Sequence, residues 1–548
     1  MRGLGPRVYA VNTPRDDPTS QDDSTSRPAF ESNVAAAAAD VDAQRQLGFS
    51  AAVRSLGYVF WVLGAMEMVE RLAYYGVKAV ATLYAKDPVS AGGLGITMTA
   101  FGTILMVWAL IQSLVPVLTG GLADRYGYKE TIFASTVVKI SGYVTMGIWT
   151  SYAGFFAGAV LLALGTAIFK PGIQGTLVKS TRPDNSSMAW GLFYQTVNIG
   201  GFLGPLLAGL MRKMAWRQVF FANAVVICAN FLLLALYREP GREERLAREA
   251  AFRRGTLSRS GLAADSLREL AKPHVYSYLI ILSGFWFMFN ALFDVLPAHI
   301  DDWVDSGDVV RTLFAGHAAV NPLVKFFVVM NKEGTSIQPE GMLNINAGLI
   351  MTTCFAVAFL GGKLRATTSM VVGTLVASAS LVVCGYSTLG WSCVAGIALF
   401  SLGEMLSSPK SSEFIGNIAP ADKKAMYLGF SQIPLAIGWT LEGKIGPALY
   451  DRFASKERFA QQMLAARGMD PVSVAQIPQG EAFAKLVATT GQSKTALTHA
   501  LYATHSVGTV WIFIAGVGVV SAVAIGFYGR SVAGLRLSAG VGKSAEAK

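Results

Sequence analysis

The stretch "REPGREERLAREAAFRRGTLSRSGLAADSLRELAK", residues 238–272, separates two sets of long apolar runs. It is charged and rich in arginine, and therefore too polar to cross a membrane. Six apolar runs precede it and six follow: 55–85, 98–121, 130–149, 151–178, 187–212 and 216–237, then 274–298, 344–362, 367–388, 390–408, 426–448 and 505–528. Because a bilayer-spanning helix needs about 20 apolar residues, the pattern predicts two six-helix halves joined by a polar linker that is long enough for a surface helix.

The composition also indicates a membrane protein. Of the 548 residues, 52% are hydrophobic and 15% charged, against about 25% charged residues in soluble domains. We therefore expect an all-α integral membrane protein with 12 transmembrane helices in two six-helix bundles. The four cysteines lie inside apolar runs and the five histidines do not cluster, so the sequence predicts no metal site and no cofactor.

The apolar runs divide the chain into five parts. We expect a disordered, polar N-terminal tail (1–52), an N-terminal bundle (53–238), a cytoplasmic linker (239–272), a C-terminal bundle (273–530) and a cytoplasmic tail (531–548). No apolar core with a cleavage site precedes Ser55, so we expect no removable signal peptide.

Lysines and arginines in alternate loops predict the orientation. They concentrate in the linker, the C-terminal tail and the loops on the same side, and the positive-inside rule makes that side cytoplasmic. The net charge of +11 thus reflects membrane topology rather than nucleic-acid binding. We expect a multi-pass plasma-membrane protein with both termini inside, and long outward-facing loops at 301–343 and 449–504.

A short motif between the second and third runs supports this architecture. "GGLADRYGYKET", residues 120–131, resembles the G-x-L-A-D-R-x-G-x-K loop of the major facilitator superfamily. A tight turn at glycine would leave Asp124 and Arg125 free to pair with a neighbouring helix end and act as a gating loop. The alternative is a charged turn that only fixes topology.

The first apolar run contains charges that a lipid-facing helix would not tolerate. Its polar residues recur at spacings of three and four and so share one face of a helix: Glu67, Glu70, Arg71, Tyr74 and Lys78. Ionisable residues inside a membrane are functional candidates because their burial is costly unless they are paired or meet water. The sequence therefore predicts a polar cavity along this face; the alternative is a self-satisfied cluster that only stabilises packing.

Other apolar runs carry isolated charges. Lys170 precedes Pro171 in the fourth run, and Glu404 lies in the tenth. Four more charged residues could line the cavity or simply lie near helix ends, and the sequence leaves their roles open: Lys139, Asp294, Glu442 and Lys444.

Several motifs together resemble the proton-dependent oligopeptide transporters, the peptide transporter family. The first run carries Glu67-x-x-Glu70-Arg71-x-x-Tyr74-Tyr75, which matches that family's helix 1 signature. Further matches are "FYQTVNIGGFLGP" (193–205), "GTAIFKPG" (165–172), "LGEMLSSP" (402–409) and "LNINAG" (343–348). The resemblance spans both halves, from about 55 to 530, and implies a proton-coupled symporter that imports di- and tripeptides by alternating access.

The resemblance and the side-chain chemistry suggest the same substrate contacts. Arg71 and Lys170 would bind the peptide carboxylate, and Glu404 would bind its ammonium. The remaining predicted substrate-binding residues are Tyr74, Tyr75, Asn198 and Asn346.

Proton coupling requires a carboxylate whose protonation breaks a salt bridge. We expect this role for Glu67 and Glu70, with Arg71 and Lys170 as partners. Protons are then the coupling ion, and the partners are a small peptide and the lipid bilayer, with no nucleic acid; a monomer is favoured.

Some positions depart from the family pattern. Ser113 stands where relatives often have tyrosine, and Asn290 and Ala291 stand where they have glutamate and glutamine. The substrate could therefore be another small solute with a carboxylate, or the protein could be a non-transporting relative that senses a ligand. We expect no enzyme: "AGVGKS" (539–544) ends like a phosphate-binding loop, but Leu537 replaces the required glycine.

Overall fold

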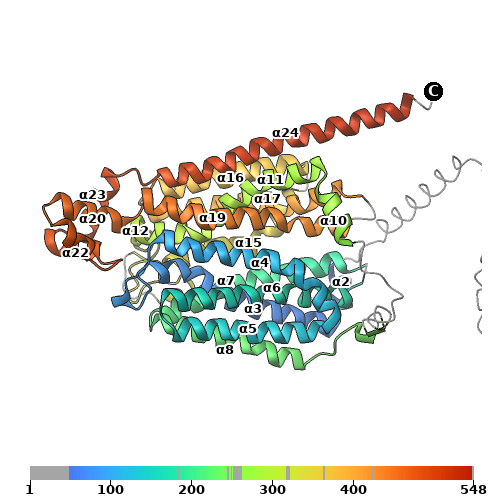
Figure 1. The fold of residues 1–548 in the computed structure, drawn as a ribbon, viewed down its shortest axis with the longest axis horizontal. Coiled ribbons are helices and arrows are strands. Elements are labelled where there is room, and N and C mark those ends of the chain that lie inside the picture. Colours follow the sequence, from blue (N-terminus) through green and yellow to red (C-terminus); the bar gives the residue numbers. More distant parts are fainter. Residues whose placement is uncertain are drawn as a thin grey trace, which may run out of the picture.

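The structure is a computed structural model that describes residues 49–182, 184–243, 246–247, 250, 262–315, 321–361, 364–420 and 424–545. Across these ranges the chain forms twelve helices of 20 residues or more. They run roughly side by side along the long axis of the molecule (Figure 1). The expected all-α fold of two six-helix bundles is confirmed.

The N-terminal bundle follows a short helix, α2 (Phe49–Ser55). Its six helices are α3 (Tyr58–Lys86), α4 (Met98–Tyr126), α5 (Tyr128–Ile148), α6 (Tyr152–Ser180), α7 (Ser186–Arg212) and α8 (Trp216–Ala235). Within the bundle α5 packs against α6 and α8, and α3 packs against α7.

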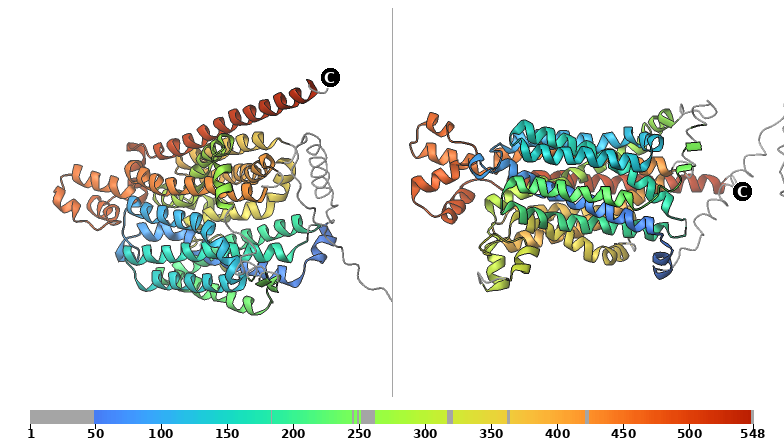
Figure 2. Two further views of the ribbon diagram at one scale, coloured as in Figure 1. Left: turned by 45° about the vertical axis from the view of Figure 1, so that its right-hand side comes forward. Right: turned by 90° about the horizontal axis from the view of Figure 1, so that it is seen from below.

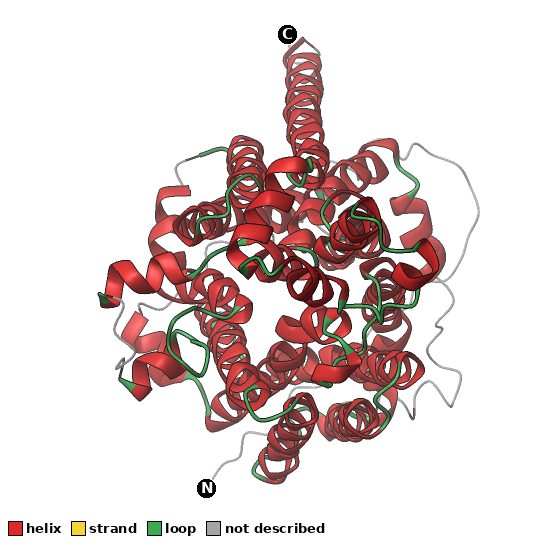
Figure 3. Ribbon diagram, turned by 90° about the vertical axis from the view of Figure 1, so that its left-hand side faces the viewer, coloured by secondary structure: helices red, strands yellow, loops and turns green. Residues whose placement is uncertain are grey.

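The C-terminal bundle begins after α10 (Leu262–Leu270), a helix in the predicted linker. Its long helices are α11 (Pro273–Asp294), α15 (Pro339–Gly361), α16 (Ala366–Gly385), α17 (Gly390–Ile418), α19 (Gln432–Phe453) and α24 (Thr509–Ala545). A short helix, α18 (Lys424–Phe430), leads into α19. The two bundles meet where α4 packs against α19 and α7 packs against α15. Figure 3 shows the helices end-on.

Capping and glycine set several helix ends. Thr97 and Ser151 accept hydrogen bonds from the backbone N–H groups of Ala100 and Gly154, and so cap α4 and α6. Gly127 separates α4 from α5 with φ 120°, a conformation open to glycine but not to residues with a Cβ. The turn predicted in the 120–131 motif is therefore at Gly127.

Eight of the long helices are apolar enough to cross a membrane by length and composition: α4, α5, α6, α8, α11, α16, α17 and α24. The other four, α3, α7, α15 and α19, carry many of the polar side chains described below. With the core clusters that fill both bundles, this arrangement is that of a multi-pass membrane protein.

The two ends of the molecule differ. One end, here called the α12 end, carries α12 (Leu296–Trp303), α13 (Gly307–Phe314) and α14 (Pro322–Phe327). It also carries a group of short helices that we call the cap: α20 (Lys456–Ala466), α21 (Pro471–Ala475), α22 (Ala482–Thr490) and α23 (Lys494–Thr504). The opposite end, with α2 and α10, is the α10 end (Figures 1 and 2).

The structure differs from the sequence prediction mainly at helix ends and in the long loops. Helix α17 continues to Ile418 although the run was expected to end at 408. Helix α24 continues to Ala545, so the predicted boundary at 530 falls inside it, and the boundary at 52 falls inside α2. The predicted loops at 301–343 and 449–504 contain helices α13 and α14 and the cap. Residues 1–48 of the predicted tail lie outside the described residues.

Candidate functional site

The charged segment of α3 lies against α7 because glycine lets the two backbones approach closely. A Cβ at Gly200 would lie 2.4 Å from the carbonyl oxygen of Met68 and 2.7 Å from the Cβ of Arg71. Gly204 is equally tight against α3, since its Cβ would lie 2.7 Å from the backbone nitrogen of Gly76. The glycines of the 193–205 motif therefore bring the site on α3 against α7.

The first pair in this segment lies within α3. The Nε of Arg71 donates to Glu67 Oε1 at 2.7 Å, across one helical turn. The Glu67 side chain is 3% exposed and that of Arg71 is 13% exposed, so the guanidinium is the more accessible partner. Glu67 Oε2 is buried without a partner among the described residues, so the pair leaves hydrogen-bonding capacity unused.

The second pair joins two helices. Lys139 on α5 donates to Glu70 Oε2, and both side chains are fully buried. The lysine ammonium also lies 4.1 Å from the ring centre of Phe169 on α6. The prediction that Glu70 pairs with Arg71 or Lys170 is therefore wrong, because periodicity within α3 says nothing about a lysine on α5.

Lys170 follows Phe169 on α6 and is partly exposed. It has no hydrogen-bond or ion-pair partner in the described part of the chain, although it lies close enough to Arg71 and Glu67 to sense their charges. A cation beside another cation and without its own counter-ion favours an anion from outside the protein.

The C-terminal bundle contributes Glu404 from α17. Its Oε2 accepts a hydrogen bond from Asn346 Nδ2 on α15 at 3.0 Å, and the same amide donates to Ser401 Oγ at 3.0 Å. Asn346 is buried while Glu404 is partly exposed. The structure thus brings these two predicted residues together and fixes the carboxylate on the bundle opposite Lys170.

Tyrosines of α3 lie between these groups. The rings of Tyr74 and Tyr75 are 5.3 Å apart, and Tyr74 also meets Trp108 at 6.0 Å. Tyr75 is partly exposed and lies near both Arg71 and Glu404. Asn198 donates to the carbonyl of Tyr194 in its own helix at 3.0 Å, which leaves its amide oxygen available.

One buried ion pair joins the two bundles. Lys78 on α3 donates to Asp294 at the end of α11, and Thr82 Oγ1 donates to the Asp294 carbonyl at 3.0 Å. The sequence marked both charges but could not predict their contact, because nothing in either run indicates which helix ends meet.

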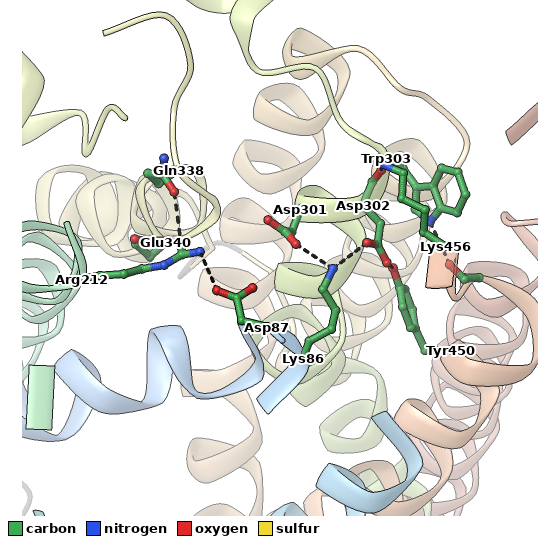
Figure 4. A network of polar contacts seen from close by, with 11 residues as sticks. Lys86, Asp87, Arg212, Asp301, Asp302, Trp303, Gln338, Glu340, Tyr450 and Lys456 are labelled. Carbon is green, nitrogen blue, oxygen red and sulfur yellow. Dashed lines mark hydrogen bonds and ion pairs between the residues drawn. The ribbon is translucent and has the colours of Figure 1, made fainter. Parts of the chain in front are cut away.

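A second set of contacts joins the bundles at the α12 end (Figure 4). Lys86 Nζ lies 2.7 Å from Asp301 and 2.6 Å from Asp302, which also accepts from Tyr450 Oη at 2.7 Å. Beside it, Arg212 of α7 lies 3.1 Å from Glu340 of α15. Sequence analysis missed these residues because they lie at helix ends and in loops.

Asp87 links the two parts of this network. Its carboxylate lies 3.7 Å from Arg212. Burial, together with the negative charge of Asp301, raises its pKa to about 6, against the opposing effect of Arg212 and Lys86. This carboxyl therefore changes charge in a mildly acidic range rather than near pH 4.

The cap contacts both bundles. Lys456 of α20 donates to the carbonyl of Asp302 at 2.5 Å, and Glu457 accepts from the N–H groups of Gly480 and Ala482 at the start of α22. On the other side, Ser90 donates to Glu481 at 2.7 Å. The cap is thus anchored to the C-terminal bundle and touches the loop that follows α3.

The two cavities described lie at the ends of the molecule. One of about 290 Å³ lies beneath the cap, between Lys86, Asp302 and Lys456, and one of about 430 Å³ lies near Lys129 and Arg242. Neither contains Arg71, Lys170 or Glu404. The described residues hold no group of three side chains suited to a metal ion.

The gating-loop residues can be placed only in part. Asp124 and Arg125 belong to the last turn of α4, but their side chains lie outside the described residues. Their predicted role remains a prediction.

Comparison with known proteins agrees with this architecture. The sequence profile of the Major Facilitator Superfamily matches residues 63–441. The chain belongs to the Major Facilitator Superfamily. It is therefore a multi-pass membrane transporter, and its two bundles are the two halves of that fold.

Curated superfamily relatives include multidrug resistance proteins. MdtH of Edwardsiella ictaluri (strain 93-146) is 24% identical over 362 residues, covering 65% of this chain and 79% of the relative. MdtH of Escherichia coli (strain K12 / DH10B) is 23% identical over 396 residues, covering 72% of this chain and 86% of the relative.

Solved structures of other transporters resemble this one in fold. A peptide transporter POT in complex with sulfate matches with a TM-score of 0.59 and 17% identity, covering 84% of this chain and 98% of the other. A POT family transporter in complex with 5-aminolevulinic acid has the same TM-score at 16% identity, covering 86% and 96%. The nucleoside transporter NupG matches at 0.60 with 10% identity, covering 86% and 99%. At these identities the likeness shows a shared fold only.

Proposed function

We propose that this protein is a proton-coupled symporter that imports di- and tripeptides across the plasma membrane by alternating access. The observation that carries the proposal is Lys170, a cation without a partner in the described structure. It lies near Arg71 in one bundle, while Glu404 is oriented by Asn346 in the other. A zwitterionic peptide has a carboxylate and an ammonium at opposite ends, so it could contact the cations of one bundle and the carboxylate of the other at the same time.

Each end of the peptide has a proposed partner. Its carboxylate binds Lys170 and the accessible guanidinium of Arg71, which offers forked hydrogen bonds. Its ammonium binds Glu404. Tyr74, Tyr75, Asn198 and Asn346 supply hydroxyl, ring and amide contacts to the rest of the peptide.

Proton coupling is proposed for the α3 cluster. Protonation of Glu67 breaks its 2.7 Å pair with Arg71 and frees the guanidinium for the substrate carboxylate. Glu70, the second predicted coupling residue, differs because its partner is the fully buried Lys139. We therefore assign the coupling proton to Glu67, whose carboxylate balances the positive charges of Arg71 and Lys170 when it is ionised. We treat Glu70–Lys139 as a structural pair.

Alternating access gives the ion pairs at the α12 end a role. By the positive-inside rule this end faces outward and both termini face the cytoplasm. Lys78–Asp294, Lys86–Asp302 and Arg212–Glu340 each join the two bundles, so their separation would accompany opening to the outside. In this view the structure represents a state closed on the outside.

Other substrates and directions of transport remain testable alternatives. Another small solute with a carboxylate would use the same Lys170 and Arg71, and a ligand-sensing relative would bind without transport. The MdtH relatives, which are named multidrug resistance proteins, favour a third alternative, in which the substrates are drugs. If the protein exports them, substrate and coupling proton would move in opposite directions.

Uptake into proteoliposomes tests the proposal. Under an inward proton gradient, labelled dialanine should accumulate in vesicles with the wild-type protein, and a protonophore should abolish the accumulation. Thermal stabilisation by dipeptides, tripeptides and non-peptide acids would identify the ligand class independently. Stabilisation without uptake of any of them would contradict transport and support a sensor.

A further inference from the structure

Three ionisable side chains meet where α3, α11 and α19 pack together. Lys78 of α3 donates to Asp294 Oδ1 of α11. The other carboxylate oxygen, Asp294 Oδ2, accepts from the indole nitrogen of Trp439 on α19 at 2.9 Å. The ammonium of Lys78 also lies 5.0 Å from the Trp439 ring. Lys78 and Asp294 are therefore fully engaged with each other and with Trp439.

The third ionisable residue is Glu442, one turn after Trp439 on α19. It is completely buried, and both of its carboxyl oxygens lack a hydrogen-bond donor within the described ranges. Its neighbour is the carboxylate of Asp294, against which it lies. The site thus contains two carboxyl groups and a single ammonium.

Among the residues that the structure describes, the surrounding helices bring no second positive charge to Glu442. The charged groups around it are Lys78 and Asp294. Helix α4, which also packs against α19, contributes the ring of Trp108 beside Lys78 and the hydroxyl of Thr103, and Thr103 accepts from Lys444 at 2.9 Å. Lys444 is thereby engaged with α4 and is not among the groups that act on Glu442.

An ionised carboxylate in such a place is unfavourable. A buried charge without a hydrogen bond loses its hydration and gains nothing in return, and in practice the group becomes neutral. Two adjacent carboxyl groups likewise cannot both ionise, and they hold one proton between them. A protonated Glu442 has an O–H that can donate to the adjacent Asp294, whereas two carboxylates have no donor.

We propose that Glu442 is a proton-binding site that is loaded while the α12 end is closed and is emptied when that end opens. Opening moves α3 away from α11 and α19, separates Lys78 from Asp294, and lets water reach Glu442. Closing the α12 end therefore takes up one proton from the outer side. This role in transport rests on the proposed alternating access, but the protonation of Glu442 in the closed state does not.

Infrared spectroscopy tests the protonation directly and needs no substrate. Purified wild-type protein near neutral pH should show the C=O stretch of a buried carboxylic acid, and that band should be missing in Glu442→Gln. Glu413→Gln, which changes a half-exposed glutamate on α17, is the matched control and should keep the band. A spectrum in which wild type and Glu442→Gln have the same carboxylic acid bands would overturn the proposal.

A crosslink between Ser90→Cys and Glu481→Cys reports closure of the α12 end, because the native side chains lie 2.7 Å apart. Because the thiols and other carboxyl groups of this end also titrate, the yield is compared at each pH with that of the same cysteine pair carrying Glu442→Gln, which imitates the protonated form. In an Asp87→Asn background, the yield with Glu442 should be below that with Glu442→Gln at high pH, and the two should converge as the pH falls. Equal yields at every pH would contradict the proposal. Neither the infrared nor the crosslinking measurement requires a substrate. Absence of peptide uptake would therefore refute the proposed peptide symport but would not decide whether Glu442 binds a proton.

Discussion

The buried pair between Glu70 and Lys139 predicts a strong energetic coupling between α3 and α5. Both side chains are 0% exposed, and Gly165 on α6 leaves room for the lysine, since a Cβ there would lie 2.4 Å from Lys139 Cγ. Removing one partner leaves a bare buried charge, which costs about 3–5 kcal/mol. Replacing both partners leaves none. Lys139→Met and Glu70→Gln should each be destabilised by that amount, and the double variant should be within about 1–2 kcal/mol of wild type.

Equilibrium unfolding of the four proteins in mixed micelles measures this cycle. Val137→Met, on the lipid-facing side of the same helix, is the control for placing methionine in α5 and should be close to wild type. Two stable single variants, or a double variant as unstable as the worse single one, would refute the pairing.

The same double variant also separates the two proposed coupling carboxylates. If Glu67 carries the coupling proton, the Glu70→Gln, Lys139→Met protein should still accumulate dipeptide under a proton gradient. If it folds and exchanges dipeptide but no longer accumulates it, Glu70 is the coupling residue and our assignment to Glu67 is wrong.

Three further predictions concern the substrate site and the α12 end. Lys170→Ala and Glu404→Gln should each reduce gradient-driven dipeptide uptake at least tenfold, the loss expected when a charge-assisted hydrogen bond of about 1.5–3 kcal/mol is removed; wild-type rates in either folded variant would mean that the site lies elsewhere. Burial raises the pKa of Asp87 from an ordinary value near 3.8 to about 6, so the folded protein holds this proton more tightly than the unfolded chain does. The free energy of unfolding should therefore fall as the pH rises from about 4 to about 6. Asp87→Asn should make the melting temperature less dependent on pH over that range, and the same dependence as in wild type would contradict this. A disulfide between Ser90→Cys and Glu481→Cys should block uptake until it is reduced, whereas uptake by the oxidised protein would show that the cap need not move.

The sequence predicted the fold well because the length of an apolar run, which decides whether a helix can span a membrane, is read from consecutive residues. Each of the twelve expected runs contains one long helix, but two runs are divided. The last residues of the run at 274–298 lie in α12, and the first residues of the run at 426–448 lie in α18. The errors arise where helices continue beyond the apolar stretch. Helix α17 passes Pro409, and α24 passes Arg530, because backbone hydrogen bonds between residues four apart continue a helix past the point where hydropathy falls.

The sequence predicted which residues share the polar face of α3, but it did not predict which residues on other helices pair with them. Spacing within α3 placed Glu67, Glu70 and Arg71 together, and the Glu67–Arg71 pair follows from an i,i+4 spacing. The pairings of Glu70 with Lys139 and of Lys78 with Asp294 join residues 69 and 216 positions apart. A single sequence holds no signal for such contacts, apart from the unusual presence of charges in the three apolar runs that carry these four residues.

The sequence also failed to predict the short helices of the cap. Residues 449–504 are polar enough to exclude a membrane span, and the sequence therefore predicted a long outward loop. Short helices form there because they pack on one another and on α12. Their hydrophobic contacts, such as the stacking of Phe459 on His505 at 3.8 Å, are too few and too far apart to give a clear periodic pattern.

Substrate-driven proton movement tests the central proposal most directly. Proteoliposomes are loaded with a pH-sensitive dye, and dialanine is added outside without an imposed proton gradient. A peptide–proton symporter should acidify the lumen, and Glu67→Gln should remove the acidification. Alkalinisation of the lumen would show exchange of substrate for proton, and no pH change despite dipeptide uptake would show transport without proton coupling; either result would contradict the proposed symport.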